Sequence, residues 1–215
     1  MPSPQDLSSQ LVDILRLDHP PIAISFEARL PANSRFDQAP VPASCVFWML
    51  AHEQTFTTIP LDHNCSVGAY THGLAEGAEI IDQPDVAALL EVGWVTMDAF
   101  AGVAKLSSRP QAITYGPFSA AESLPDVVLL RVSPRQMMEI SDAVAVEFSG
   151  KPQCQILPRA TERGTIAASM GCALSRARTG MAEDELTCAV PGGRVSELVD
   201  ALGVVRRAND AVALL

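Results

Sequence analysis

The sequence lacks the motifs that identify the common nucleotide-dependent and hydrolytic enzymes. It contains no G-x-x-x-x-G-K-[ST] loop, no G-x-G-x-x-G after a strand, no G-x-S-x-G and no H-E-x-x-H. Each of these patterns places backbone N–H groups, a nucleophile or metal ligands in a geometry that its chemistry requires. Their absence argues against kinase, P-loop, Rossmann-type and ordinary serine-hydrolase functions.

Long apolar runs and clusters of positive charge are also missing. No apolar run reaches the roughly 18 residues of a membrane span, and the opening MPSPQDLSSQL has neither a basic nor an apolar signal region. Lys105 and Lys151 are the only lysines, and the formal net charge is -10, which disfavours binding to nucleic acid or anionic membranes. We therefore expect a soluble, cytoplasmic protein that binds neither.

What the sequence does contain is enough apolar residues for a substantial core. The chain has 215 residues, of which 48% are hydrophobic. Chains of this length bury most of the surface that they would expose unfolded, so we expect a single globular domain over residues 1–215. Two small domains are the alternative.

Capping residues and apolar periodicity predict alternating helices and strands. Ser3 with Pro4 predicts a first helix that ends before His19, and Ser133 with Pro134 predicts a helix over 134–148. The other predicted helices are 45–54, which as an apolar run also fits a strand, one that begins at Cys65, 84–94, 193–204 and 206–215. Strands are predicted at 21–27, 55–59, 126–132 and 186–190, with a loop over 29–42. This pattern indicates an α/β or α+β fold, in which a single mixed sheet is covered by helices.

Three segments together resemble a known family. They are CVFWMLA with a second cysteine in NCSVGAYTHGL, then PDVVLLRVSPRQMMEISDA, then MGCALSRARTGMAEDELTCAVP. In this order they are similar to domain of unknown function 169, a family of uncharacterised bacterial and archaeal proteins. The resemblance runs roughly from Pro21 to the helix after Pro191 and implies the domain, but no reaction, substrate or cofactor. It implies that family cysteines are to be sought at Cys45, Cys65, Cys154 and Cys172, whereas Cys188 matches no family position.

The cysteines are the main candidates for chemistry. Their odd number, five, favours reduced thiols over a disulfide framework. Cys45, Cys65 and Cys172 follow Ser44, Asn64 and Gly171, which would place each thiol in the first turn of a helix, where the helix dipole favours a thiolate.

Three interpretations of these thiols stay open. Cys45, Cys65, Cys154 and Cys172 could bind an iron–sulfur cluster or another thiophilic metal, Cys65 and Cys172 could be cofactor-free reactive thiols, or all could be inert core residues. The spacings of 20 residues from Cys45 to Cys65 and 18 from Cys154 to Cys172 include no C-x-x-C. A zinc site through His63 and Cys65 does not have a typical zinc spacing, so the four histidines are expected to be exposed or core residues.

Positive charge is concentrated near the fourth of these cysteines. Between residues 151 and 180 five cations accompany a single acid, inside a chain of net charge -10. Arginine binds carboxylate and phosphate groups bidentately, so Arg176 and Arg178 are candidates to hold an anionic small molecule beside Cys172. The alternative is that both arginines pair with the acidic run at 182–185.

Two classes of function follow. The first is a cysteine-containing protein that binds a cluster and an anionic small molecule, for redox or sulfur-transfer chemistry. The second is a non-catalytic ligand-binding or interaction protein with structural cysteines, in which apolar segments such as CVFWML could also form a contact between subunits of a homo-oligomer. Convergence of the cysteines in the fold would favour the first class.

Overall fold

A computed structural model describes residues 2–32, 35–37 and 44–213 of the protein. Within these residues the strands form one sheet of seven, in the order β2-β3-β1-β4-β7-β6-β5. All neighbouring strands are antiparallel except β5 and β6, which are parallel, so the expected mixed sheet is confirmed. The strands are β1 Ile22–Glu27, β2 Phe56–Thr58, β3 Ala112–Pro117, β4 Val127–Val132, β5 Glu147–Ser149, β6 Ala167–Ser169 and β7 Leu186–Pro191.

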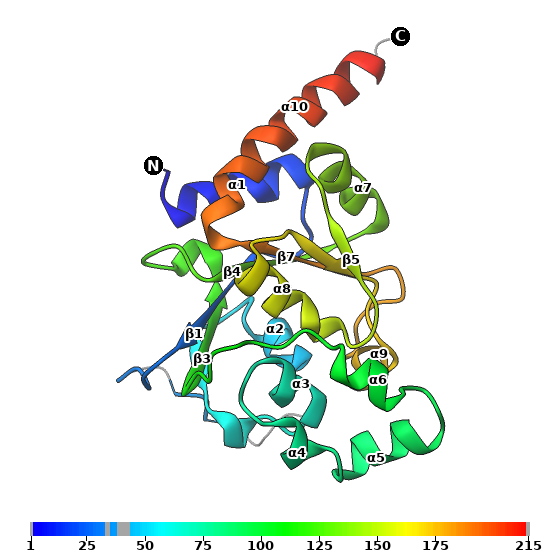
Figure 1. Ribbon diagram of the computed structural model, residues 1–215. Helices are drawn as coiled ribbons and strands as arrows, with labels where there is room; N and C mark the ends of the chain where they lie inside the picture. Colours follow the sequence, from blue (N-terminus) through cyan, green and yellow to red (C-terminus); the bar gives the residue numbers. More distant parts are fainter. Residues whose placement is uncertain (1, 33–34, 38–43, 214–215) are drawn as a thin grey trace.

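Helices cover both faces of this sheet (Figure 1). The α-helices are α1 Pro4–Leu15, α2 Cys45–Leu50, α3 Ser66–Thr71, α4 Gly77–Ile80, α5 Pro84–Glu91, α6 Met97–Ala101, α7 Pro134–Ala143, α8 Ile156–Arg163, α9 Ala173–Thr179 and α10 Val195–Ala213. Short 3₁₀ turns are η1 Pro60–Asp62, η2 Phe118–Ala120, η3 Gln153–Gln155 and η4 Gly192–Arg194.

The alternation of side chains along the central strands builds two separate cores. On β4, Val128 and Leu130 face the core that α1, α7 and α10 cover, while Val127 and Leu129 face the core that includes α2 and α8. Successive residues of a strand point to opposite faces, and β4 is buried on both, which explains its uninterrupted apolar sequence.

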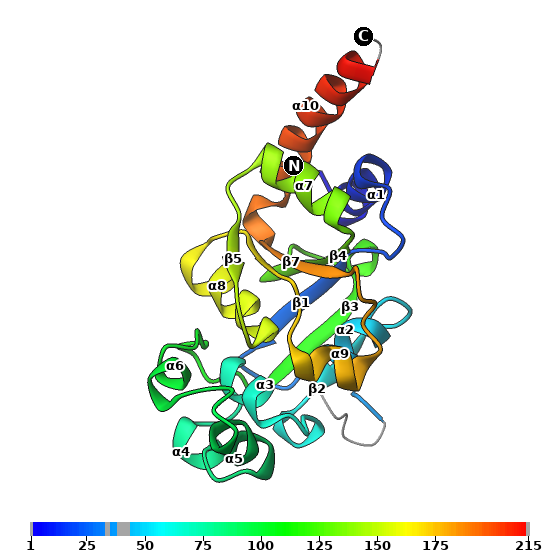
Figure 2. The same cartoon turned by 90° about the vertical axis from the view of Figure 1, so that its right-hand side faces the viewer.

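Helices α3 to α6 pack a small third core beside the second one (Figure 2). Val67, Tyr70, Ile80, Val86 and Phe100 form this cluster, in which the Tyr70 and Phe100 rings stack 5.0 Å apart. A carboxylate oxygen of Asp85 accepts a hydrogen bond from the Ser66 N–H at 3.2 Å, which ties α5 to the start of α3. This small core therefore holds α4, α5 and α6 against α3.

Several predicted elements are confirmed, with shifted ends. Ser3 caps α1 and Ser133 caps α7, each through its hydroxyl oxygen, as expected. The prediction that the second of these helices runs to residue 148 is wrong, because Val144 is extended and Phe148 lies in β5, paired with β6. The two predicted C-terminal helices form one continuous helix, α10. Residues 214–215 of the second predicted helix lie outside the described part, as do 33–34 and 38–42 of the expected loop.

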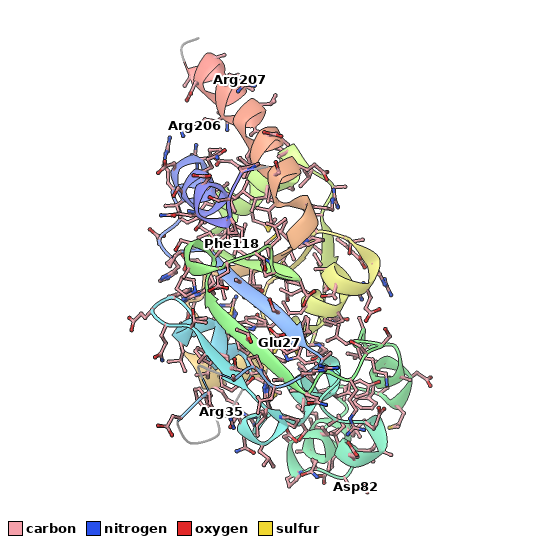
Figure 3. All side chains as sticks on the ribbon, turned by 90° about the vertical axis from the view of Figure 1, so that its left-hand side faces the viewer. Glu27, Arg35, Asp82, Phe118, Arg206 and Arg207 are labelled. Carbon is pink, nitrogen blue, oxygen red and sulfur yellow. The ribbon has the colours of Figure 1, made fainter. Side chains whose placement is uncertain are left out.

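One face of β1 and β3 is not covered by a helix (Figure 3). The side chains on this face include the small polar Ser25 and Thr114, which line a groove together with Thr57 of β2 and with Glu122 and Ser123. The opposite face of the same strands carries Ile24, Ile113 and Tyr115 and is fully buried. The candidate site lies on that buried side.

Candidate functional site

Four of the five cysteines lie in segments that pack against the buried face of β1, β3 and β4. Cys45 is the first residue of α2, Cys65 immediately precedes α3, Cys154 lies in η3, and Cys172 immediately precedes α9. Cys45, Cys65 and Cys154 are buried, while Cys172 is partly exposed. The expectation that three thiols lie at helix starts is thus confirmed, although Cys65 replaces Asn64 as the residue before the helix.

These four thiols are close neighbours, and we call them the thiol centre. Burial raises the pKa of Cys154 well above its usual value, and the other three thiols raise it further. Burial likewise raises the pKa of Cys45, with added contributions from Cys172 and Cys65. A like charge disfavours ionisation only at short range, so these mutual effects mark thiols from four distant segments as one group.

Cys188 is not part of this centre. It lies on β7 among the side chains that face α1, α7 and α10, on the other side of the sheet from Cys45 and Cys154. Burial alone raises the pKa of Cys188 to about 12. The cysteine that the family resemblance could not place is therefore the one that the fold separates.

Polar groups donate hydrogen bonds to the sulfurs. Gln153 Nε2 donates to Cys45 Sγ at 3.0 Å, and Thr71 Oγ1 donates to Cys154 Sγ at 3.2 Å. Cys65 accepts from the backbone N–H groups of Gly68 and Ser44, which partly offset the rise in its pKa that burial causes. Sulfur is a weak acceptor in a neutral thiol and a better one when it carries charge, so these donors favour thiolate or metal-bound sulfur.

Close approach of backbone to sulfur explains a glycine in α3. A Cβ atom at Gly68 would lie 2.4 Å from Ser44 Oγ and 3.4 Å from Cys65 Sγ. Only glycine therefore lets Ser44 and Cys65 pack against this turn of the helix. The residue that weakens the helix locally is the one that allows the centre to close.

A buried histidine is held beside the centre by two hydroxyl groups. Ser44 Oγ lies 3.0 Å from His63 Nδ1, and Thr58 Oγ1 lies 3.0 Å from His63 Nε2. Both ring nitrogens are thus occupied, and burial, followed by the neighbouring His72, lowers the pKa of His63 well below its usual value. His63 is neutral and structural here, which argues against the zinc pair with Cys65.

The second buried histidine, His72, has no hydrogen-bond partner for its ring nitrogens among the described residues. His72 is 0% exposed, its ring centroid lies 6.3 Å from that of His63, and it follows Thr71, the donor to Cys154. Gln153 Oε1 likewise has no hydrogen-bond partner within the described part of the chain. Buried polar atoms are nearly always paired in folded proteins, so these unpaired atoms point to ordered water or a ligand beside them.

The expected activation of the thiols by helix starts is wrong for Cys45 and Cys65. Helices α2 and α3 have only six residues each, and burial raises the pKa of both thiols. For Cys65 burial outweighs the opposite effect of Arg178, so both thiols favour the neutral form. This finding argues against a free catalytic thiolate at Cys65.

The two candidate arginines differ in their roles. The guanidinium group of Arg176 donates to the carbonyl oxygens of Met170, Ala182 and Glu185, and so closes the loop around α9. This is neither the expected contact with an anion nor the alternative pairing with acidic side chains. Arg178 lies near Cys65 and slightly lowers the pKa of that thiol, against the larger effect of burial.

A buried ion pair forms the wall of the centre next to Cys45. Arg131 on β4 binds Glu185 through Nε and Nη2, with both distances 2.6 Å, and its Nη1 donates to His52 Nδ1 at 3.3 Å. His52 stacks on His19 at 4.9 Å, and burial together with the positive charge of Arg131 lowers the pKa of His52 to about 4. A space of about 10 Å³ separates this pair from Cys45, which is too small for any ligand.

Sequence reasoning missed several side chains of the centre. Tyr115 on β3 lies near Cys45 and Cys154, and burial, followed by Cys45, raises its pKa. Gln153 and Thr71 were also missed, because a single amide or hydroxyl in a sequence carries no signal of its contacts. The alternation of Ile113 and Tyr115 with Thr114 and Gly116 was a strand signal that could have located Tyr115 on a buried face.

Two further findings concern metal binding and membrane crossing. Among the residues that the structure describes, no three His, Cys, Asp or Glu side chains are arranged to hold a single metal ion. In the same residues, no helix is both long enough and apolar enough to cross a membrane. The thiols are therefore neighbours without forming a ready mononuclear site.

Comparison with known proteins identifies the family. No curated protein and no solved structure matches the chain. Residues 10–201 match the family model DUF169, described as uncharacterised ArCR. This match covers most of the chain and includes all four residues of the thiol centre, so the protein belongs to the domain of unknown function 169 family.

Proposed function

We propose that the protein binds an iron–sulfur cluster, or another thiophilic metal group, through Cys45, Cys65, Cys154 and Cys172, for redox or sulfur-transfer chemistry. The observation that carries this proposal is the convergence of four thiols from four separate segments. Cysteine is often buried for packing alone, but packing gives no reason for thiols from four separate segments to affect one another's ionisation while Cys188, on the other face of the sheet, takes no part.

The raised pKa values agree with a metal-binding role. Neutral thiols at Cys45, Cys65 and Cys154 tolerate each other in a buried site, whereas thiolates there would repel strongly without a metal cation. A bound metal reverses this balance, since a coordinating thiol is deprotonated outright and metal binding releases protons. Thiols that are inert in the absence of metal can therefore become ligands in its presence.

A polynuclear cluster suits the centre better than a single ion. The described residues contain no three side chains grouped around one point, as zinc requires. In a cluster each iron takes its own thiolate, so the sulfurs stand farther apart around a larger body. The donors from Gln153 and Thr71 would then serve as hydrogen bonds to ligating sulfur, which tune the reduction potential of such clusters.

Cys172 and Arg178 complete the proposal. Cys172 is the least buried of the four thiols, so it is the position at which a substrate can reach the centre. An anionic ligand beside Cys172 stays a prediction, with Arg178, which lies near Cys65, as the candidate cation. Because thiols stay reduced in a reducing compartment, we also propose that the protein is located in the cytoplasm.

The test is metal analysis of protein purified without oxygen. We expect broad absorption near roughly 400 nm with iron and acid-labile sulfide, about four of each per chain for a [4Fe–4S] cluster. Serine in place of Cys45, Cys65 or Cys154 should remove most of the iron.

Cys188→Ala is the matched control, because it removes a buried thiol from the opposite face of the sheet. It should leave the iron content unchanged. Protein that stays free of iron and zinc after anaerobic reconstitution, or that loses iron equally in Cys188→Ala, would overturn the proposal in favour of structural cysteines.

A further inference from the structure

An apolar pocket lies beside Cys172, between the helical segment that contains α5 and α6 and the start of α9. Its volume is about 60 Å³, and its lining includes Val67, Leu89, Trp94, Phe100, Pro152 and Leu174. We call it the Cys172 pocket. Of all the side chains that line it, only Lys151 is charged.

The one charge at this pocket is already engaged. The Lys151 ammonium group lies 4.0 Å from the centre of the Trp94 ring and donates a hydrogen bond to the Trp94 carbonyl oxygen. These contacts fix the position of Trp94 relative to Lys151. Lys151 therefore holds Trp94 in place at the pocket, and its ammonium group has little capacity left to pair with a charged ligand.

The Cys172 pocket is the approach to the thiol centre that the described residues offer. Cys172 lines the pocket and also raises the pKa of Cys45 and Cys154, so the same side chain belongs to both. On the opposite side, the space between Cys45 and the Arg131–Glu185 pair measures only about 10 Å³. A ligand therefore reaches the centre past Cys172.

We propose that the Cys172 pocket admits a small, uncharged, apolar molecule, or the short alkyl end of a larger one, to the thiol of Cys172. The volume sets the size, because one water molecule needs about 10–15 Å³ of such a cavity, so about 60 Å³ allows roughly four to six heavy atoms. The lining sets the polarity, since a carboxylate would lose its hydration without gaining a partner. The role of this ligand in chemistry rests on the proposed function, but its binding does not.

Xenon is a direct probe, because apolar cavities in proteins bind it without any polar contact. The metal-free protein is placed under xenon pressure, and methyl resonances of Val67, Leu89 and Leu174 are followed by ¹H–¹³C NMR. We expect saturable shifts of these methyl groups, with any other shifts confined to the remaining methyl groups of the pocket lining. At half-saturating xenon the alkylation of Cys172, followed by mass spectrometry, should slow about twofold, since bound xenon blocks the approach to the sulfur.

A pair of variants locates the effect. Ala99 lines the pocket while its residue is largely exposed, so Ala99→Leu can fill the space without disturbing a core. Ala87, exposed on α5 and not part of the lining, gives the matched control Ala87→Leu. Ala99→Leu should abolish both the shifts and the protection of Cys172, and Ala87→Leu should preserve them.

Shifts that do not saturate, or that persist in Ala99→Leu, would overturn the inference. The pocket would then be a packing defect between helices and not a binding site. This result is independent of metal analysis. Xenon binding without iron would support the pocket and count against the cluster, and iron without xenon binding would do the reverse.

Discussion

Replacing Glu185 with glutamine tests the ion pair that walls the thiol centre. The side chains of Arg131 and Glu185 are only 5% and 10% exposed, and two bonds of 2.6 Å join them. Removing one member leaves the other buried without an opposite charge, which typically costs about 3–5 kcal/mol. For a chain of this length, that loss corresponds to a fall in melting temperature of roughly 6–20 °C.

Urea unfolding followed by circular dichroism measures this loss, and a second ion pair supplies the control. Arg194 binds Glu197 through two bonds of 2.8 and 2.6 Å, but these side chains are 33% and 54% exposed. Because solvent screens an exposed pair, Glu197→Gln should change the free energy of unfolding little. The double variant Arg131→Met/Glu185→Leu should recover much of the stability that Glu185→Gln loses, since it leaves no charge buried.

Equal losses for Glu185→Gln and Glu197→Gln would refute the reasoning, because burial would then not decide the energy of the pair. A double variant no more stable than Glu185→Gln would also contradict it. In that case the two residues would stabilise the protein through something other than compensation of charge.

Three further predictions concern the surroundings of the thiols. Gly68→Ala should destabilise the protein by about 1–3 kcal/mol and lower its iron content, because a Cβ 2.4 Å from Ser44 Oγ forces that hydroxyl away from His63. Urea unfolding and iron analysis would check this prediction. An unchanged free energy of unfolding with unchanged iron content would contradict it. Burial lowers the pKa of His72 to about 4, so the stability that its neutral form contributes is complete above about pH 6.5 and is lost as the pH falls through 4. The full effect is on the order of 3 kcal/mol, and His72→Phe should flatten the measured pH profile, whereas parallel profiles would count against the shift. Arg176→Ala should accelerate amide hydrogen exchange in residues 181–186, because three carbonyl contacts that fold this loop are lost, and unaltered exchange would show that the loop holds itself.

The sequence predicts the elements of the fold whose signals are local. Ser3 and Ser133 cap helices with their own hydroxyl groups, and the apolar run at 127–132 is a strand buried on both faces. Strand order depends on contacts between distant residues, which no local pattern records. Phe148 was assigned to a helix because its spacing from Met137 and Val144 fits helical periodicity, yet pairing with β6 places it in a strand.

The candidate site shows the same division. Cysteine is rare enough to be singled out by type, and the four residues named from the sequence are those that gather in the fold. The direction of the pKa shifts of Cys45, Cys65 and Cys154 was not predictable, because it depends on burial by segments that are distant in the sequence. For Arg176, a sequence shows the charge but not the carbonyl oxygens of Met170, Ala182 and Glu185 that occupy it.

The position of β7 in the sheet bears on how the protein is made. This strand is the last in the chain, yet it lies between β4 and β6 near the middle of the sheet. During synthesis, β1 to β6 must therefore wait with an open gap until residues 186–191 leave the ribosome, and long-range pairing of this kind is slow. Thiols carried by earlier segments are exposed to solvent during that interval. Glu185 immediately precedes β7, so its ion pair with Arg131, which forms the wall beside Cys45, also closes only at this late step.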